Sequence, residues 1–563
     1  MTKTQYHRKN ITDGKYRPFP KVQLEDRTWP NRQIETAPIW CSVDLRDGNQ
    51  ALYNPMSIEQ KMTYFDELVR VGFKEIEIGF PAASQTDFDF TRMLIQRGRI
   101  PSDVTIQVLV QAREELVKRT FEALDGAQNV IVHLYNSTSP AQRRDVFGMT
   151  KDEIVQIAVS GVKMIKNELT KVTSGHYRLE YSPESFSGTE LEFSKEISNA
   201  VIREWDPSAN GKMILNLPAT VEMSTPNIHA DQIEWMCRHI EQRENVIVSV
   251  HAHNDRGCAV AASELSLLAG ADRVEGTLFG NGERTGNTDL VTMALNMYTQ
   301  GVDPLLNLYD VDRLKSIYQR ETGMTVHPRH PYAGELVYTA FSGSHQDAIS
   351  KGLKARRSEH RVVWDVPYLP IDPIDVKRSY EAIVRINSQS GKGGMAYVLE
   401  AQAGFALPRV MQILFSQHVQ EAADRTGEEL EPAEIETLFT DEFVNRSEKY
   451  ALVNLQVNRN LKSTDAGHRT RIDATLTIEG ATHNCEASGD GIIDALSIAL
   501  RNLGIDFKVT SFDEHALDAG SNAKAAAYIG VQMADGRTST GAGVDTDIAI
   551  ASARALLCAL NRV

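Results

Sequence analysis

Short runs of apolar, largely β-branched residues alternate with longer stretches of helical periodicity between residues 37 and 300. Eight such runs occur, at residues 38–43, 74–79, 104–110, 129–134, 177–181, 212–217, 245–250 and 273–278. Stretches between them, such as residues 57–71 and 151–170, have the apolar spacing of amphipathic helices, and Ser57 is a suitable N-cap for the first. Eight strand–helix alternations in about 260 residues match the strand number and size of a (β/α)8 barrel.

A doubly wound open sheet is the alternative fold for this alternation. Its dinucleotide-binding form has a G-x-G-x-x-G turn after the first strand, whereas residues 44–50 read DLRDGNQ. We therefore predict a barrel at residues 37–302, after an N-terminal arm at residues 1–36. Residues 303–431 are expected to form a mostly helical linker region, and residues 432–563 a C-terminal α+β domain.

The composition is that of a globular protein, with 42% hydrophobic and 24% charged residues in a chain of 563. A formal net charge of -15 argues against a nucleic-acid or anionic-membrane partner, because such partners attract clustered cationic side chains. No apolar run reaches the length of about 18 residues that a membrane span needs. The five cysteines form no C-x-x-C pair, which fits a reduced, cytoplasmic compartment.

Polar residues near the ends of the predicted strands are the candidates for an active site, because sites in this fold lie there. In chain order they are Asp44 to Asp47 after the first strand, His133 in the fourth, Ser182 and Glu184 after the fifth, Thr220 after the sixth, His251 and His253 after the seventh, and the sequence GNGERTGN at residues 280–287 after the eighth. The first, seventh and eighth strands become neighbours when the barrel closes. Asp47, His251, His253 and Asn287 are therefore expected to meet on the rim.

Two imidazoles from positions i and i+2 of a strand point to the same side, and such pairs suit divalent transition metals. With oxygen ligands and open positions the set would suit Mg²⁺, Mn²⁺ or Zn²⁺ in a catalytic site. Each residue also has an ordinary interpretation: packed histidines, a surface ion pair of Arg46 and Asp47, a solvated Glu184, and a flexible connection at residues 280–287. Their joint occurrence on one rim favours the metal site.

Three segments carry a family resemblance: DLRDGNQ at residues 44–50, HAHND at residues 251–255 and GNGERTGN at residues 280–287. They resemble the motifs of the acyl-CoA-condensing enzymes of the DRE-type metallolyase superfamily. From about residue 18 to residue 563 the chain resembles the 2-isopropylmalate synthase family in its longer bacterial form. The resemblance implies condensation of acetyl-CoA with 2-oxoisovalerate to 2-isopropylmalate and CoA, the first committed step of leucine biosynthesis.

The resemblance also implies roles for individual residues and cofactors. The metal ligands would be Asp47, His251, His253 and Asn287; the oxoacid pocket would contain Arg46, His133, Ser182, Glu184 and Thr220; and the catalytic residues would be Arg46, Glu184, Glu283, His345 and Tyr368. His345 and Tyr368 lie in the linker region, and His345 would reach the active site of the partner subunit in a homodimer. Mg²⁺ or Mn²⁺ is expected ahead of Zn²⁺, with K⁺ as an activator.

A glycine-rich segment at residues 387–394 follows a strand-like run at residues 381–386. It lacks the G-x-x-x-x-G-K-[ST] pattern, so a nucleoside triphosphate site is not expected there. One interpretation of this segment is a flexible loop. The other, which the family resemblance allows, is a contact to CoA. Residues 428–436 are rich in Glu and are expected to form an exposed connector.

The last part of the chain contains an internal repeat. Its predicted strands are residues 451–457, 471–478 and 481–486 before a helix at 492–503, and then residues 507–512, 525–533 and 538–540 before a helix at 544–560. Two G-x-G steps, Gly489 with Gly491 and Gly541 with Gly543, lie 52 residues apart. Such a turn before a helix exposes backbone N–H groups that bind carboxylates, although it could equally be a tight turn in a dimerisation domain. The resemblance implies a regulatory domain at residues 432–563 that binds leucine as a feedback inhibitor near these glycines.

Several other functions are compatible with the same motifs. Related condensing enzymes use pyruvate (citramalate synthase) or 2-oxoglutarate (homocitrate synthase), and lyases or aldolases of the same barrel cleave carbon–carbon bonds. A non-catalytic effector-binding protein is a further alternative. The C-terminal repeat and the linker histidine favour a synthase over a lyase, and the intact metal set disfavours a pure sensor.

Overall fold

The computed structural model describes residues 15, 17–340, 342–380, 399–400, 403–426, 430, 432–459, 469–518, 520 and 522–563. The strand-like run at residues 381–386 and the glycine-rich segment at residues 387–394 lie outside the described residues. The chain divides into two compact units, Met1–Val337 with Ile374–Arg378, and Tyr338–Pro373 with Ser379–Val563. Among the helices of the described residues, none has the length and apolar character needed to cross a membrane.

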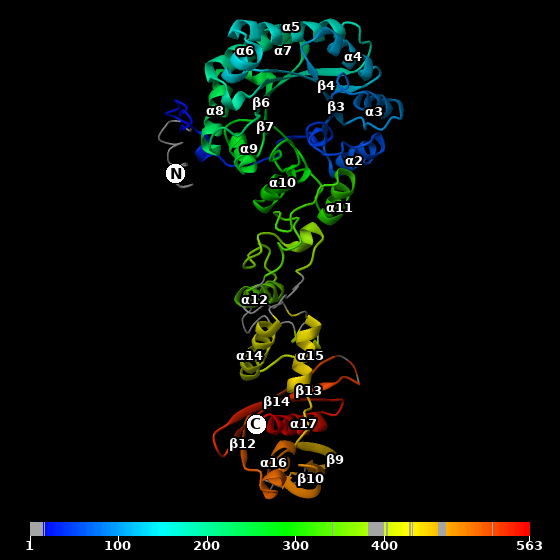
Figure 1. The fold of residues 1–563 in the computed structure, drawn as a ribbon, viewed down its shortest axis with the longest axis vertical. Coiled ribbons are helices and arrows are strands. Elements are labelled where there is room, and N and C mark those ends of the chain that lie inside the picture. Colours follow the sequence, from blue (N-terminus) through cyan, green and yellow to red (C-terminus); the bar gives the residue numbers. More distant parts are fainter. Residues whose placement is uncertain are drawn as a thin grey trace, which may run out of the picture. The chain divides into compact units, whose positions relative to one another are not determined.

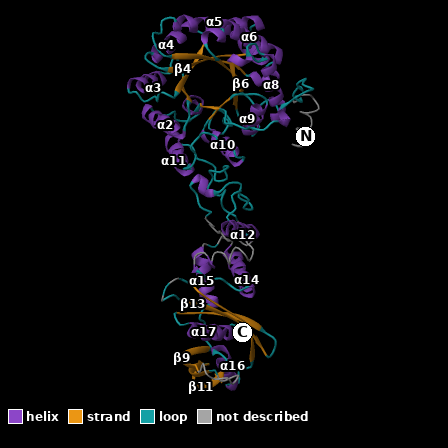
Figure 2. Cartoon of the chain, turned by 180° about the vertical axis from the view of Figure 1, so that it is seen from behind, coloured by secondary structure: helices purple, strands orange, loops and turns teal. Residues whose placement is uncertain are grey.

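The first unit contains a closed barrel of eight parallel strands, which confirms the predicted fold. The strands are β1 (Ile39–Ser42), β2 (Glu75–Gly79), β3 (Thr105–Gln111), β4 (Asn129–Ser137), β5 (His176–Glu184), β6 (Met213–Ala219), β7 (Val246–Ala252) and β8 (Arg273–Gly276). They pair in sequence order, and β1 also pairs with β8 to close the ring. Figures 1 and 2 show these strands as an inner ring surrounded by helices. All eight predicted strands are present, although β5 and β7 continue further than expected, so that Ser182, Glu184 and His251 lie within strands.

Ten α-helices are described in the first unit. They are α2 (Ile58–Val71), α3 (Gln85–Gln96), α4 (Glu114–Leu124), α5 (Lys151–Leu169), α6 (Leu191–Trp205), α7 (Pro207–Asn210), α8 (Pro226–His239), α9 (Ala259–Leu268), α10 (Leu290–Thr299) and α11 (Val311–Thr322). Of these, α2, α3, α5, α10 and α11 begin at a side-chain cap. The predicted N-cap Ser57 is confirmed: its Oγ accepts a hydrogen bond from the Gln60 N–H at 3.3 Å, in a reciprocal capping box. The helix ends at Gly72, whose φ of 114° is accessible to glycine at little cost.

The interior of the barrel is charged. Glu75, Glu77, Glu180, Arg273 and Glu275 point inward and are at most 5% exposed. Because an unpaired buried charge is costly, these carboxylates need cationic partners or bound protons. The Arg273 guanidinium is one such partner, and it donates to Glu75 Oε2 at 2.6 Å and to Glu275 Oε1 at 2.8 Å. Burial raises the pKa of Glu180 well above its usual range, which favours its protonated form. Glu75 and Arg273 are the first residues of β2 and β8, and Glu275 lies further along β8, beside His251.

The second unit contains helices and two small sheets, as the predicted fold class requires. Its elements are α12 (Gly343–Glu359), α14 (Arg409–Thr426), α15 (Pro432–Phe443), β9 (Tyr450–Arg459), β10 (Thr470–Ile478), β11 (Ala481–Gly489), α16 (Ile492–Asn502), β12 (Phe507–Ala516), β13 (Ala525–Met533), β14 (Thr538–Asp545) and α17 (Ile548–Asn561). The antiparallel sheets have the orders β11-β10-β9 and β12-β13-β14, so the two βββα repeats are confirmed. Helices α16 and α17 contribute to one core with residues of both sheets.

Two local predictions for the second unit were wrong. Residues 432–436 form the start of α15 rather than an exposed connector. The predicted turn at Gly541 and Gly543 is also absent, because both residues lie within β14 and the helix begins only at Ile548. The reason is close packing: a Cβ atom at Gly541 would lie 2.2 Å from the Ala559 nitrogen, and one at Gly543 would lie 1.9 Å from the Ala551 oxygen. These glycines allow strand β14 to approach helix α17.

Candidate metal-dependent active site

A cavity of about 320 Å³ lies at the C-terminal ends of the barrel strands. It is lined by Arg46, Asp47, Gln50, Leu109, His133, Tyr135, Ser182, Glu184, Asn216, Pro218, Thr220, His251, His253, Glu283 and Arg284. The structure thus brings together most residues singled out from the strand ends. Asn287 is adjacent, because its Nδ2 donates a hydrogen bond to Asp47 Oδ2 at 2.7 Å.

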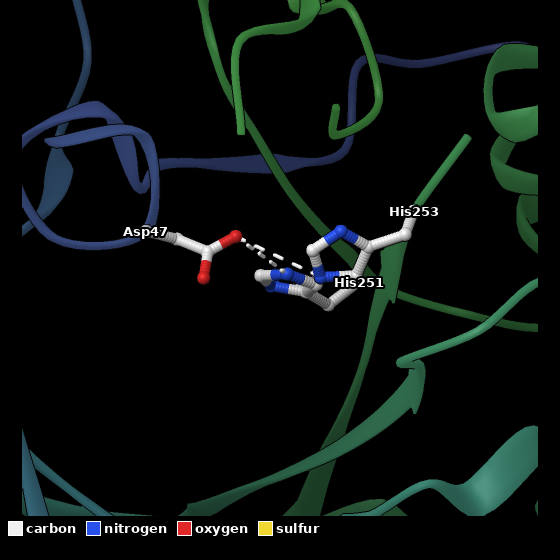
Figure 3. Close-up of side chains that lie close together, drawn as sticks. All are labelled: Asp47, His251 and His253. Atoms are coloured by element: carbon white, nitrogen blue, oxygen red, sulfur yellow. Dashed lines mark ion pairs between the residues drawn. The ribbon is translucent and has the colours of Figure 1, made fainter. Parts of the chain in front are cut away.

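Asp47, His251 and His253 form a compact buried group (Figure 3). Asp47 belongs to η2 (Asp44–Gly48), a π-helical turn that follows β1 after one residue. His251 lies in β7 and His253 just beyond its end. Asp47 Oδ2 is 3.5 Å from His251 Nε2 and 3.7 Å from His253 Nε2, and the candidate ligand atoms all lie within 4.8 Å of one another. One cation could therefore contact all three side chains.

The orientation of His251 is set by Glu275. His251 Nδ1 lies 2.7 Å from Glu275 Oε2, so Nε2 is the nitrogen that faces Asp47. A carboxylate that holds the far nitrogen of a histidine is typical of metal sites. Glu275 is itself fixed, since it accepts hydrogen bonds from Gln107 Nε2 at 3.0 Å and Asn216 Nδ2 at 3.2 Å, in addition to the bond from Arg273.

The protonation states of these residues follow from their neighbours. Burial disfavours the charged form of Asp47, but Arg46 and His251 outweigh it and hold the pKa of Asp47 well below its usual range. Burial and the adjacent His251 lower the pKa of His253 to about 4. Burial also opposes the charge on His251, but its hydrogen bonds to Asp47 and Glu275 raise its pKa to about 9. At neutral pH, Asp47 is thus ionised and His253 neutral, the states in which both bind metals, whereas His251 is protonated and would release its Nε2 proton when a metal binds.

The donor set fits a divalent metal. Among the described residues, Asn287 Oδ1 is a buried acceptor for which the structure contains no hydrogen-bond partner. Leaving such a group unpaired costs about 1–3 kcal/mol, and a cation beside Asp47 is the kind of partner that a buried amide oxygen accepts. Two imidazoles, one carboxylate and one amide oxygen suit Mg²⁺, Mn²⁺ or Zn²⁺.

Glu77 organises the opposite side of the cavity. Its Oε2 accepts a hydrogen bond from Arg46 Nε at 2.5 Å, and its Oε1 lies 2.7 Å from His133 Nδ1. Arg46 Nη1 also donates to Asp47 Oδ1 at 2.6 Å. The other nitrogen of His133 shares a hydrogen bond with Ser182 Oγ at 2.7 Å. Arg46, His133 and Ser182 are therefore held in fixed orientations by one buried carboxylate.

The sequence analysis missed both the supporting carboxylates and part of the lining. Glu77 and Glu275 lie on predicted strands, and an acidic residue at an inward position of a buried strand was the available signal. Gln50, Leu109, Tyr135, Asn216 and Pro218 also line the cavity, together with Arg284 from the predicted segment at residues 280–287. The period of two along a strand relates Tyr135 to His133 and could have identified Tyr135 as a lining residue.

Two further acidic residues face the cavity. Glu184 accepts a hydrogen bond from Ser137 Oγ, and Glu283 Oε1 accepts one from Gln50 Nε2 at 3.4 Å. Thr220 Oγ1 accepts a hydrogen bond from the Ser185 N–H at 2.8 Å, which joins the ends of β5 and β6. The cavity therefore combines carboxylates with the metal-ligand group.

His345 and Tyr368 belong to the second unit, and the structure brings them to each other. Their rings stack with centroids 4.0 Å apart and an interplanar angle of 24°. His345 is near the start of α12, and Tyr368 is 59% exposed with a φ of 63°. A positive φ is strained for an aromatic residue, and strain of this kind gathers at functional positions.

A second cavity, of about 760 Å³, lies in the C-terminal repeats. It is lined by Arg459, Gly491, Ile492, Ile493, Asp494, Ser497, Arg501, Phe507, Lys508, Val509, Phe512, Glu514, Ile548, Ala549 and Ser552. Of the four glycines expected near an effector, Gly491 is the one among these described lining residues. It precedes α16, whose N-terminus has no side-chain cap.

A closed (β/α)8 barrel with an Asp–His–His group at its mouth defines a metal-dependent barrel enzyme. Comparison with family models agrees: residues 37–317 match the HMGL-like family, residues 335–400 the alpha-isopropylmalate synthase post-catalytic domain-like family, and residues 429–563 the LeuA allosteric (dimerisation) domain.

Complete relatives specify the family further. The chain is 55% identical to a 2-isopropylmalate synthase of Agrobacterium fabrum over 98% of this chain and 99% of the relative. It is also 53% identical to a 2-isopropylmalate synthase of Pseudomonas putida, over 97% of each chain. The chain belongs to the 2-isopropylmalate synthase family, as the sequence motifs predicted.

Proposed function

We propose that this enzyme condenses acetyl-CoA with 2-oxoisovalerate and hydrolyses the resulting thioester, giving 2-isopropylmalate and CoA. The observation that carries the proposal is the barrel cavity, in which Asp47, His251 and His253 lie beside Arg46 and Glu184, in a chain of this family. The ketone of the oxoacid must be polarised by an electrophilic site, and the weakly acidic methyl group of acetyl-CoA must lose a proton to a base. The cavity combines residues suited to both.

The oxoacid is proposed to bind across the metal side of the cavity. Asp47, His251, His253 and Asn287 would hold a divalent metal, which polarises the ketone when bound. Arg46 is fixed by Glu77 with its guanidinium at the cavity wall, where it can hold carboxylate or carbonyl oxygens. The apolar side chains of the lining, Leu109, Tyr135 and Pro218, suit the isopropyl group of 2-oxoisovalerate.

Proton transfers are assigned to the acidic residues of the cavity. A methyl proton of acetyl-CoA passes to Glu184 or Glu283, and the methyl carbon bonds to the keto carbon while the C=O π electrons move to the keto oxygen. A proton returned by the acid–base residues of the site then converts this oxygen to a hydroxyl. Water then cleaves the thioester and releases CoA, which makes the overall reaction effectively irreversible. We propose that the stacked pair His345 and Tyr368 completes this acid–base set across a homodimer.

The C-terminal cavity is proposed to bind L-leucine as a feedback inhibitor. The start of α16 has no side-chain cap, and backbone N–H groups at such a helix N-terminus suit the carboxylate of an amino acid. Asp494 and Glu514 also line this cavity and suit its ammonium group. Ile492, Val509 and Ile548 offer the apolar surface that an isobutyl side chain would cover.

Thiol release from acetyl-CoA tests the proposal most directly. We expect release with 2-oxoisovalerate that greatly exceeds release with pyruvate or 2-oxoglutarate, and suppression by leucine. Release that is fastest with another oxoacid would contradict the substrate assignment. No release with any of the three would contradict the condensation itself and favour a lyase, which an assay of carbon–carbon cleavage would then detect.

A further inference from the structure

The segment that follows α11 is tied to the loop that carries Glu283 and Asn287. His330 Nε2 lies 2.7 Å from Asp289 Oδ2, and its Nδ1 is 2.8 Å from the Pro331 oxygen. Asp289 is the N-cap of α10 and accepts a hydrogen bond from the Val291 N–H at 3.0 Å. Because Asp289 follows Asn287 by only two residues, the ion pair fixes the end of the loop.

The start of the same loop is held by ring contacts. Phe279 has a φ of 58°, a left-handed conformation that is strained for a bulky residue and persists only where the surroundings impose it. Its ring packs against Tyr318 of α11, with centroids 5.0 Å apart, and against His330, with centroids 5.5 Å apart. His330 thus contacts both ends of the loop, at Phe279 and at Asp289.

The loop between these ends is compact and sensitive to small displacements. The Asn287 N–H donates to the Gly280 oxygen at 3.0 Å. A Cβ atom at Gly286 would lie 2.0 Å from the same oxygen, so the two sides of the loop are in contact. A shift of Phe279 or Asp289 would therefore be transmitted to Glu283 and Asn287.

Hydrogen bonds from Arg378 hold the segment that contains His330. Arg378 donates to the Gly334 oxygen at 2.7 Å and to the Ala333 oxygen at 2.9 Å, and its Nε donates to Asp312 Oδ2 at 3.0 Å. The Gly334 N–H in turn donates to the His330 oxygen at 2.9 Å. Arg378 therefore connects α11 to the turn that presents His330.

We propose that His330 is a positioning residue for the reaction and that Arg378 keeps it in place. Through Phe279 and Asp289, His330 holds the loop from Gly280 to Asn287 in the arrangement that catalysis needs. The second unit begins at Tyr338, after the segment that contains His330, and resumes at Ser379, directly after Arg378. The linker thus has a covalent connection to residues that hold the catalytic loop. The kinetic part of this inference rests on the proposed function, but the positioning of the loop does not.

Hydrogen–deuterium exchange tests the positioning in the intact enzyme. His330→Phe keeps a ring beside Phe279 but removes the bond to Asp289. Arg378→Ala removes the hydrogen bonds to Asp312, Ala333 and Gly334. Arg243→Ala is the matched control, because Arg243 likewise binds two carbonyl oxygens, of Val246 and Gly270, and one carboxylate, of Asp272. Both test variants should exchange faster than wild type in peptides covering residues 278–290, and the control should not. Unchanged exchange in both test variants would overturn the proposal.

Turnover provides the second measurement. A displacement of catalytic groups by about 1 Å can cost about 10²-fold in rate, so we expect kcat to fall at least about tenfold in His330→Phe and Arg378→Ala. His330→Gln, which can still donate to Asp289, should recover part of this loss. A double variant no worse than the more damaged single variant would indicate that both residues act through the same loop.

The outcomes separate the two proposals. Faster exchange with an unchanged kcat would overturn the inference that His330 and Arg378 position the loop for catalysis. A wild-type enzyme that releases no CoA would contradict the proposed function, and the exchange measurement would still decide whether His330 positions the loop.

Discussion

The barrel cavity and the C-terminal cavity differ in the residues that line and support them. In the barrel, the side chains that face the cavity are held by fully buried charges, such as Glu77 behind Arg46 and Glu275 behind His251. The larger C-terminal cavity is lined by apolar residues, by exposed charged residues such as Asp494 and Lys508, and by a helix N-terminus. Phe512 and Ile548 on its wall are 45% and 38% exposed. The barrel cavity is organised by buried, hydrogen-bonded charges, and the C-terminal cavity by exposed charges, apolar surface and backbone.

This difference matches what each cavity is proposed to do. Stabilising charge that develops during a reaction requires groups that are already oriented, because reorientation would raise the barrier. Recognising an amino acid requires only complementary surface and a few polar groups. Substitutions in the barrel should therefore change the chemistry, whereas those at the C-terminal cavity should change the response to an effector.

The largest effect is expected for His253→Ala. Removing one of the four proposed ligand side chains should abolish high-affinity metal binding and reduce thiol release to background. Little change in folding is expected, because His253 follows the end of β7 and lines the cavity. Titration calorimetry with Mn²⁺ and the release assay measure the two losses. Normal activity in a sample stripped by a chelator and then supplied with metal would exclude the ligand assignment.

Glu275→Gln should weaken the metal site without removing a ligand. Loss of a carboxylate that orients a metal-binding histidine typically lowers metal affinity by about 10–100-fold. Calorimetric titration of the variant measures this change. Glu67→Gln is a suitable control, since Glu67 is a buried carboxylate bound by Arg70 and Arg313. An equal loss of metal affinity in both variants would show that general destabilisation, rather than His251 orientation, is responsible.

Gly543→Ala should destabilise the C-terminal repeats. The added Cβ atom would lie 1.9 Å from the Ala551 oxygen and 2.5 Å from the Ala555 nitrogen of α17, so strand and helix must separate. Overpacking of this kind typically costs about 1–3 kcal/mol. Urea unfolding followed by circular dichroism measures it. A variant as stable as the wild type would show that β14 and α17 do not require this close approach.

Gly491→Ala should have the smallest effect on stability. Gly491 has an extended φ of -155°, and no atom lies within 4 Å of its added Cβ, so we expect an unfolding free energy within about 0.5 kcal/mol of wild type. Since Gly491 lines the C-terminal cavity, the leucine concentration for half-inhibition should rise. An unchanged leucine response would place the effector away from the start of α16.

Much of the fold follows from local patterns in the sequence. The eight barrel strands and the capping of α2 by Ser57 were predicted correctly, because alternating periodicity and cap chemistry act over a few residues. The grouping of Asp47, His251 and His253 was predictable as well, since closure of a parallel barrel brings the ends of β1, β7 and β8 together. Their role as metal ligands stays a prediction.

Other features depend on residues that are distant in the sequence. The G-x-G steps of the two repeats are alike in sequence, and their first glycines, Gly489 and Gly541, both pack against the following helix. Their second glycines differ, because Gly491 borders a cavity while Gly543 packs against α17. Sequence periodicity could not distinguish these roles, because the packing partner of each glycine is set by the fold.

The sequence alone determined the barrel, the repeated C-terminal unit and the residue types at the strand ends, since each depends on local periodicity or on the geometry of a closed barrel. Only the tertiary structure decided which buried carboxylate supports which cavity residue, as Glu275 supports His251, and that His330 contacts both ends of the loop carrying Asn287. The physical reason is that hydrogen bonds and ring contacts between distant segments depend on ångström-scale positions, which no local pattern specifies.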